Sequence, residues 1–259
     1  MSFRTSGVYS AELVRRSQNF RSLFITGTDT GVGKTTVSCC LAAVLRSRGL
    51  SVGVFKPAET GCPVNADGCR APDDAQRLAF FAANDRELAE ICPYALTDPL
   101  APAVAADRDA IRIELSRIVA AHETMAAAHD ITLVEGAGGL LVPLTHSLTF
   151  ADLALRLQLP VLLVVGNRLG AINHALLTVR AARAQGLEVV GYIVNALSPD
   201  GDPVTETNRA VLHQWLGPAL GSVPHLGQVE MREDERRRLA QVAAQSIEIE
   251  LILNKLRLG

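Results

Sequence analysis

The sequence feature that most limits what this chain can fold into is a strand, a glycine-rich turn and a helix start within residues 23–36. The apolar run Leu-Phe-Ile leads into a turn with three glycines, which ends in Lys-Thr-Thr. Small residues let backbone N–H groups surround phosphate oxygens, and the helix start adds partial positive charge. We therefore predict a nucleotide phosphate loop, in which Lys34 reaches the β- and γ-phosphates and the Thr35 hydroxyl holds magnesium.

The spacing of this loop departs from the usual one. A glycine normally stands five residues before Gly33, but that position is Thr28, and the nearest glycine is Gly27. An ordinary glycine-containing turn is the alternative interpretation, and Gly-Lys-Thr-Thr directly after an apolar strand argues against it. The longer spacing favours those protein families that use this variant of the loop.

Apolar runs alternate with helical patterns along the rest of the chain. We expect strands at 22–26, 51–55, 130–134, 160–166, 188–194 and 221–223, and helices at 34–48, 73–82, 109–128, 149–157, 172–185 and 203–216. Gly49 and Gly186 follow two of these helices, where a left-handed residue is favoured. The alternation predicts an α/β fold, a single-domain and mostly parallel β-sheet with helices on both faces. Ligands of such sheets bind beyond the carboxyl ends of the strands.

Composition narrows the class of protein further. Hydrophobic residues make up 48% and the net charge is −2, so neither nucleic acid nor an anionic membrane surface is indicated as a partner. No apolar run of about 18 residues predicts a transmembrane helix. The five cysteines include no Cys-x-x-Cys pair, which favours reduced thiols in the cytoplasm.

We expect residues 1–21 to form a poorly ordered N-terminal extension and residues 22–259 to form the one domain. The extension contains serines and arginines with a single acid, Glu12. A mitochondrial transit peptide therefore stays open as the alternative.

Four segments resemble those of the dethiobiotin synthetases in order and spacing. Residues 27–35 match their Gly-Thr-x-Thr-x-Val-Gly-Lys-Thr pattern. After the second, third and fourth strands come Phe-Lys-Pro-Ala-Glu-Thr-Gly at 55–61, Val-Glu-Gly-Ala-Gly-Gly at 134–139 and Val-Gly-Asn-Arg-Leu-Gly-Ala-Ile-Asn-His at 165–174. The resemblance spans roughly residues 22–226 and implies a P-loop NTPase fold.

The resemblance implies an ATP-dependent ligase of biotin biosynthesis. In that family 7,8-diaminononanoate reacts with CO2 to give a carbamate, MgATP phosphorylates the carbamate, and the second amine closes the ring to dethiobiotin. It also implies a cytoplasmic homodimer whose partners are these small molecules. A carbamate attacking a phosphate brings anions together, so cations must neutralise the developing charge. Lys34 serves the nucleotide side, and Lys56, directly after a strand, serves the carbamate side.

The resemblance also assigns the remaining residues of the site. Thr30 joins Lys34 and Lys56 as catalytic, and magnesium, which prefers oxygen ligands, is held by Thr35, Asp74 and Glu135. Asp73 remains open as the metal ligand in place of Asp74, or as the helix N-cap. ATP is bound by Gly31, Val32, Gly33, Lys34, Thr35, Thr36, Glu135, Gly136, Ala137, Gly138, Asn195, Ala196, Pro224, His225 and Leu226. The diamine is bound by Thr60 and, across the dimer, by Gly170, Ala171 and Asn173.

Two other classes of protein share this kind of loop. Partitioning and septum-site ATPases carry an early lysine in Lys-Gly-Gly-x-Gly-Lys-Thr, where residues 29–35 here read Asp-Thr-Gly-Val-Gly-Lys-Thr. Their membrane-targeting helix has a weak counterpart in the apolar tail at 247–258, whose balanced charges instead favour a packed C-terminal helix. A cobyrinate-type synthetase needs a glutamine-hydrolysing domain, which we do not expect after residue 226.

Overall fold

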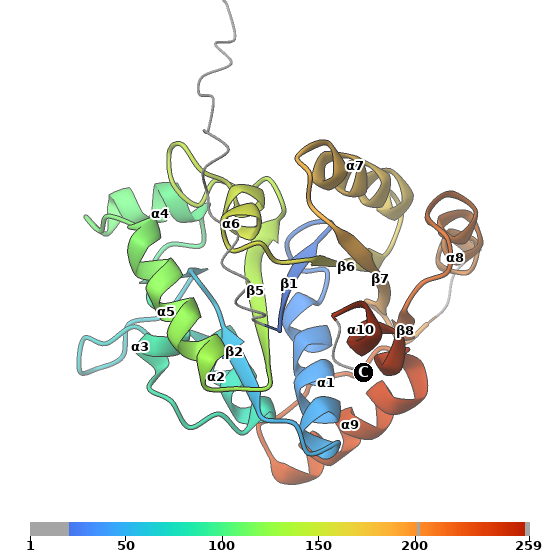
Figure 1. Cartoon of the computed structure of the whole chain (residues 1–259), viewed down its shortest axis with the longest axis horizontal. Helices are drawn as coiled ribbons and strands as arrows, with labels where there is room; N and C mark the ends of the chain where they lie inside the picture. Colours follow the sequence, from blue (N-terminus) through green and yellow to red (C-terminus); the bar gives the residue numbers. More distant parts are fainter. Residues whose placement is uncertain (1–20, 201–202, 257–259) are drawn as a thin grey trace, which may run out of the picture.

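In the computed structural model, which describes residues 21–200 and 203–256, the chain is built around a six-stranded parallel sheet (Figure 1). The strand order is β2-β5-β1-β6-β7-β8, and each neighbouring pair is parallel. The strands are β1 (Ser22–Gly27), β2 (Val52–Phe55), β5 (Ile131–Gly139), β6 (Val161–Asn167), β7 (Val189–Ala196) and β8 (Gly221–Val223). This confirms the predicted α/β class.

Helices cover both faces of the sheet, because alternate residues of each strand point to opposite faces. Leu23 and Ile25 pack in one core with α1, α2, α9 and α10, whereas Phe24 packs on the other face against Phe150 of α6. Figure 1 shows α1 and α9 on one side of the strands and α6 and α7 on the other. The helices are α1 (Lys34–Ser47), α2 (Asp73–Ala82), α5 (Leu115–Ala127), α6 (Phe150–Arg156), α7 (Ala171–Ala184), α8 (Pro203–Leu216), α9 (Glu233–Ser246) and α10 (Ile249–Lys255).

The region after β2 differs most from the sequence-based expectation. It holds a small parallel pair of strands, β3 (Glu59–Thr60) and β4 (Ala95–Leu96), and two short helices, α3 (Leu88–Ile91) and α4 (Pro102–Arg108). The predicted helix at 109–128 is wrong at its start, since α5 begins only at Leu115. Asp109 instead accepts a hydrogen bond from Thr97 N at 2.8 Å, and Ala110 has a φ of 53°, so the chain leaves the helix there.

The ends of several helices agree with the predictions made from the sequence. Gly49 and Gly186 have φ values of 85° and 82°, as predicted for left-handed helix ends. The packed C-terminal helix is confirmed as α10, whose apolar side chains Ile249, Ile252 and Leu253 are buried. The described part of the chain contains no helix long and apolar enough to span a membrane. The predicted N-terminal extension lies, except for Arg21, outside the described residues.

Candidate active site

The loop between β1 and α1 has the backbone that its glycines require. Gly33 has a φ of 89°, and a Cβ there would come within 2.1 Å of Asn195 Nδ2. A Cβ on Gly27 would lie 2.6 Å from Val32 Cγ2. Thr28 is not among the described residues with positive φ, so the backbone at position 28 does not require a glycine. The loop therefore requires glycine at positions 27 and 33 and not at position 28, which accounts for the unusual spacing of its glycines.

A cleft of about 380 Å³ opens beside this loop at the carboxyl edge of the sheet. It brings together most of the residues expected around the phosphates, the diamine and the metal. The cleft also contains two charged residues that sequence reasoning missed, Glu59 and Arg77. The expected residues in its lining are Thr30, Gly31, Gly33, Lys34, Thr35, Thr36, Lys56, Thr60, Asp73, Asp74, Ala137 and Gly138.

Lys56 follows β2 and lies beneath the cleft with only 2% of its surface exposed. Its Nζ lies 2.6 Å from Asp74 Oδ2 and 2.6 Å from Glu135 Oε1, and Glu135 is fully buried. Burial alone would lower the pKa of Lys56, but Glu135, Asp74 and Glu59 together raise it above the usual range. The ammonium therefore stays charged at neutral pH. Although burial opposes it, Lys56 also holds the pKa of Asp74 below its ordinary value.

The Thr35 hydroxyl meets the same two carboxylates from the other side. Its Oγ1 lies 2.8 Å from Asp74 Oδ1 and 2.8 Å from Glu135 Oε1, and it donates its single proton to one of them at a time. Within the described residues, Glu135 Oε2 is buried without a hydrogen-bond partner. Asp74, rather than Asp73, makes these contacts. Asp73 is not the N-cap of α2 either, since that position is Pro72.

Lys34 and Thr30 lie on the loop itself. Lys34 is 8% exposed, and its Nζ donates a hydrogen bond to Asp29 O at 3.1 Å. Burial lowers the pKa of Lys34 to about 8, and the charge of Glu135 opposes this shift in part. A Cβ on Gly138 would lie 3.4 Å from Thr30 Oγ1, so the Thr30 hydroxyl lies close to the backbone at the C-terminal end of β5.

The residues expected near adenine do not line this cleft. Asn195 is 4% exposed, donates from Nδ2 to Val32 O at 3.1 Å, and keeps a buried Oδ1 with no partner among the described residues. Ala196 and Pro224 line a second hollow, of about 970 Å³, along β7, β8 and α8. His225 and Leu226 line neither hollow.

The structure also keeps Gly170, Ala171 and Asn173 out of the cleft. Gly170 is the left-handed N-cap of α7, and the N–H of Ala171 donates to Arg168 O at 3.1 Å. The Ala171 amide is therefore already engaged, and Asn173 is exposed on the first turn. Arg168 forms an ion pair of 2.5 Å with Asp29, which places this helix start beside the outer side of the phosphate loop. Gly136 lies buried within β5, where a Cβ would approach the Phe24 ring to 3.3 Å.

Glu59 is a member of the site that the sequence did not reveal. Its Oε1 accepts from Asp74 N at 2.8 Å and its Oε2 accepts from Ala75 N at 3.0 Å. Burial raises the pKa of Glu59 to about 7, against the charge of Lys56. The acid was visible between Lys56 and Thr60, but nothing in the sequence pairs it with a helix that begins at residue 73. Arg77 lies about one turn after Asp74 on α2, and its guanidinium donates a hydrogen bond to Val229 O at 2.8 Å.

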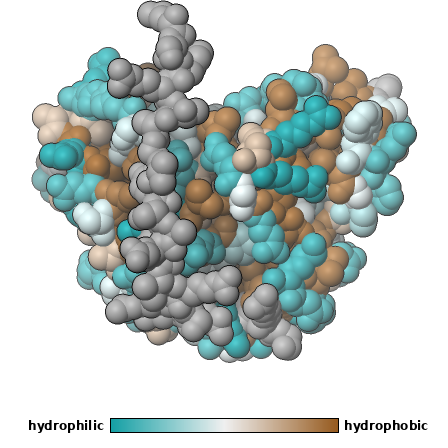
Figure 2. All heavy atoms as spheres, turned by 45° about the horizontal axis from the view of Figure 1, so that its top comes forward, coloured by the Kyte–Doolittle hydropathy of each residue, from teal (hydrophilic) through white to brown (hydrophobic). Residues whose placement is uncertain are grey.

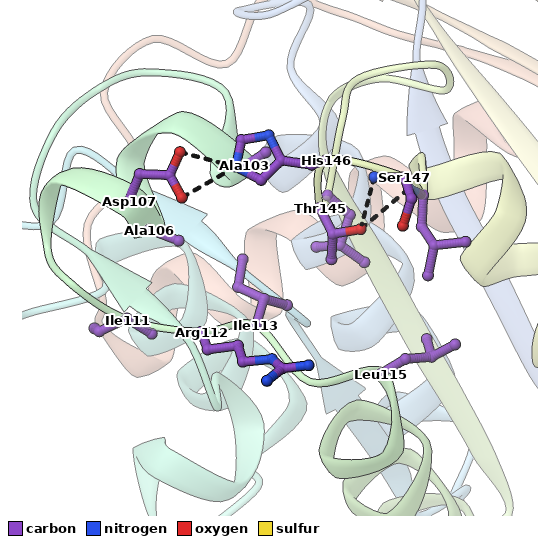
Figure 3. A pocket seen from close by; sticks show the side chains of 12 residues that line it. Ala103, Ala106, Asp107, Ile111, Arg112, Ile113, Leu115, Thr145, His146 and Ser147 are labelled. Carbon is purple, nitrogen blue, oxygen red and sulfur yellow. Dashed lines mark hydrogen bonds and ion pairs between the residues drawn. The ribbon is translucent and has the colours of Figure 1, made fainter.

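Another hollow, of about 370 Å³, lies between α4 and the loop at 144–148 (Figure 3). Asp107 and His146 face each other across its mouth with an ion-pair distance of 2.8 Å, and Arg112 lies at the other side. Its lining includes none of the residues predicted for the site. The residues predicted for the phosphates, the diamine and the metal are instead gathered in the cleft beside the phosphate loop.

Comparison with known proteins assigns the chain to a family. Residues 21–233 match the family described as AAA domain. The ATP-dependent dethiobiotin synthetase BioD of Anaeromyxobacter dehalogenans (strain 2CP-C) is 46% identical over 190 residues, covering 73% of this chain and 83% of that protein. The protein of that name from Thermodesulfovibrio yellowstonii is 39% identical over 240 residues, covering 89% and 98%.

Solved structures share the fold at low sequence identity. pNOB8 ParA bound to nonspecific DNA is 11% identical with a TM-score of 0.58, covering 91% of this chain and 98% of that one. The Pyrococcus furiosus cell division ATPase MinD is 15% identical with a TM-score of 0.55, covering 92% and 99%. These two likenesses support the P-loop ATPase fold alone. By its relatives, the chain belongs to the family of ATP-dependent dethiobiotin synthetases, which are ligases.

Proposed function

We propose that the cleft beside the phosphate loop phosphorylates the carbamate of 7,8-diaminononanoate with ATP, after which the second amine displaces phosphate and closes the ring. The observation that carries this assignment is Lys56, a charged and buried lysine within 2.6 Å of two carboxylates below the cleft. Desolvating an ammonium is costly, so a lysine held in this way indicates a task for its charge. That task is to attract the anionic carbamate and to stabilise the negative charge that develops as it attacks the γ-phosphate.

The two lysines of the cleft would neutralise the negative charge of different reactants. Lys34, at the start of α1, would reach the nucleotide phosphates, whereas Lys56, which directly follows β2, also lines the cleft and would serve the carbamate. Preorganised cations in a partly desolvated cleft stabilise a phosphoryl-transfer transition state better than they would in water. Thr30 and Thr60, which also line the cleft, supply hydroxyls that orient the diamine and its carbamate.

The donor set fits magnesium. Among the described residues no group of three or more His, Cys, Asp or Glu side chains could hold a metal by itself. Thr35, Asp74 and Glu135 offer hard oxygens, and the orphaned Glu135 Oε2 is an acceptor that needs a partner. Magnesium typically uses one or two carboxylates and completes its shell with waters and phosphates. When bound, it would neutralise the β- and γ-phosphate oxygens.

Asn195 is suited to bind the adenine base of the nucleotide through its side-chain amide oxygen. Its amide nitrogen is taken by Val32 O, which leaves the buried Oδ1 facing no donor among the described residues. Such an oxygen matches the exocyclic amino group of adenine, since an unsatisfied buried acceptor is costly. Ala196, in the next position, and Pro224 then border the base from the ends of β7 and β8.

We also propose that the active unit is a homodimer in the cytoplasm. The start of α7 at Gly170 and Asn173 does not line the cleft of its own chain, and a helix N-terminus is suited to a carboxylate. A twofold interface would bring this helix start to the partner's diamine. Leu169, Leu177 and Trp215 are 83%, 56% and 60% exposed. Figure 2 shows hydrophobic side chains over the region of α7 and α8, which the interface would cover.

Phosphate release from ATP tests the proposal. We expect release to require the diamine and bicarbonate together and to match dethiobiotin formation one for one. A protein that released phosphate at the same rate without the diamine would be an ATPase of the partitioning kind, and the assignment of the cleft to carbamate chemistry would fail.

A further inference from the structure

We propose that Glu59 is a positioning residue, which holds the first turn of α2 so that Asp74 stands against Thr35 and Lys56 in the geometry that binds the metal. This inference rests on the metal site proposed above. It concerns a residue outside the ligand set, which acts through the helix that carries a ligand.

The start of α2 lacks a cap of its own. The first N–H groups of a helix need acceptors, which an N-cap Ser, Thr, Asp or Asn usually supplies to the second and third helical residues. Here the N-cap is Pro72, whose side chain makes no such bond. The two oxygens of Glu59 accept from Asp74 N at 2.8 Å and Ala75 N at 3.0 Å instead. The cap is therefore supplied by β3, which lies earlier in the chain.

The residue whose N–H is held is also the one whose side chain reaches the site. Asp74 contacts Thr35 Oγ1 at 2.8 Å and Lys56 Nζ at 2.6 Å. Glu59 is itself anchored, because its backbone N–H donates to Tyr94 O at 2.9 Å and only 6% of its surface is exposed. Lys56 and Glu59 lie on one short segment, so the spacing between the lysine and Asp74 is set by the bonds from Glu59 to α2.

A purely structural cap and a positioning residue predict different results. A cap that only stabilises α2 lowers the stability of the protein and leaves the metal affinity of the folded fraction unchanged. A residue that orients a ligand changes metal affinity directly, typically by about 10- to 100-fold when it is removed. Metal binding by the folded protein therefore separates the two roles.

The test is the Glu59→Gln variant, whose amide keeps one acceptor and places a donor against the other N–H. Binding of Mn²⁺ to the nucleotide-free protein is measured by the loss of the free Mn²⁺ electron paramagnetic resonance signal, because a nucleotide would itself chelate the ion. We expect Mn²⁺ to bind at least about 10-fold more weakly than to the unmodified protein. The matched control is Asp109→Asn, because Asp109 accepts from Thr97 N at 2.8 Å outside the cleft. This control should lose stability and keep its Mn²⁺ affinity.

The outcomes separate this inference from the proposal on which it rests. Equal Mn²⁺ affinity of Glu59→Gln and the unmodified protein, while Asp74→Asn binds more weakly, would overturn the positioning role and leave the metal site intact. Unchanged affinity in Asp74→Asn as well would overturn the metal site, and the positioning role with it. If Glu59→Gln fails to fold, Glu59→Asp keeps both acceptors on a shorter arm, and its affinity should fall between those of the unmodified protein and Asp74→Asn.

Discussion

Removing the charge of Lys56 should have two separable consequences, one for stability and one for catalysis. In the described structure the Lys56 ammonium is 2.6 Å from the fully buried Glu135 carboxylate, whose other oxygen has no partner. Lys56→Met leaves that carboxylate buried without its direct ion-pair partner, and the charge of Lys34 in the cleft still acts on it. Breaking a buried pair in this way costs about 3–5 kcal/mol of unfolding free energy. For a chain of this size, the melting temperature falls by roughly 6–20 °C.

The double variant Lys56→Met/Glu135→Gln isolates the cause. It removes both charges and keeps nearly the same volume, and replacing a whole buried pair is often close to neutral. We expect it to recover most of the lost stability in guanidinium denaturation, measured with a chelator present to exclude metals. Both variants should still release phosphate at least about 100-fold more slowly, because the transition-state charge is no longer neutralised.

Two results would contradict this role of the Lys56 charge. A loss of less than about 1 kcal/mol in Lys56→Met would mean that the pair is screened as a surface pair is. A double variant no more stable than the single one would mean that Lys56 stabilises the fold through another contact, such as its ion pair with Asp74 at 2.6 Å, rather than by countering Glu135.

Variants at four other places in the protein have outcomes that the structure predicts. Lys34→Ala and Thr35→Val should each slow phosphate release at least about 100-fold with an unchanged circular dichroism spectrum, and a normal rate in either would remove the phosphate-loop assignment. Asn195→Ala should weaken ADP binding about 10-fold in calorimetry, whereas unchanged affinity would place adenine elsewhere. Burial lowers the pKa of His122 to about 4, so the folded state binds fewer protons than the unfolded state, and stability is lost as the pH falls below about 6.5. His122→Gln should spare about 2 kcal/mol of that loss between pH 7 and pH 5, and equal pH slopes would contradict this. Mixing Lys34→Ala with Asn173→Glu should restore about a quarter of full activity, and no recovery after confirmed subunit exchange would exclude a site shared between chains.

Most of the larger elements of the fold were predictable because their signals are local, although helix α9 (Glu233–Ser246) was not predicted. Strands buried on both faces of a parallel sheet read as continuous apolar runs, and all six predicted runs coincide with strands of the described sheet to within a few residues. The phosphate loop was predictable because it is contiguous. The two-residue strands β3 and β4 were not, since each is defined only by its pairing with the other.

Which residues form the site depends on tertiary contacts more than on the local sequence. Nothing local distinguishes Asp73 from Asp74, and only the register of α2 turns the second of them toward Thr35. The Glu59 cap is equally hidden, because its partners lie on a helix that begins after an intervening loop. The family resemblance placed Lys56 in the site, but its burial between two carboxylates became visible only in the structure.

Attack of the carbamate on the γ-phosphate of ATP can be detected by following the oxygen atoms. The enzyme is given bicarbonate labelled with oxygen-18 in unlabelled water, and the released phosphate is analysed by mass spectrometry during a single turnover. We predict that the phosphate carries one labelled oxygen, because the bond between the carbamate oxygen and phosphorus survives ring closure. Unlabelled phosphate, released while dethiobiotin is formed, would mean that water attacks ATP, and would contradict this account.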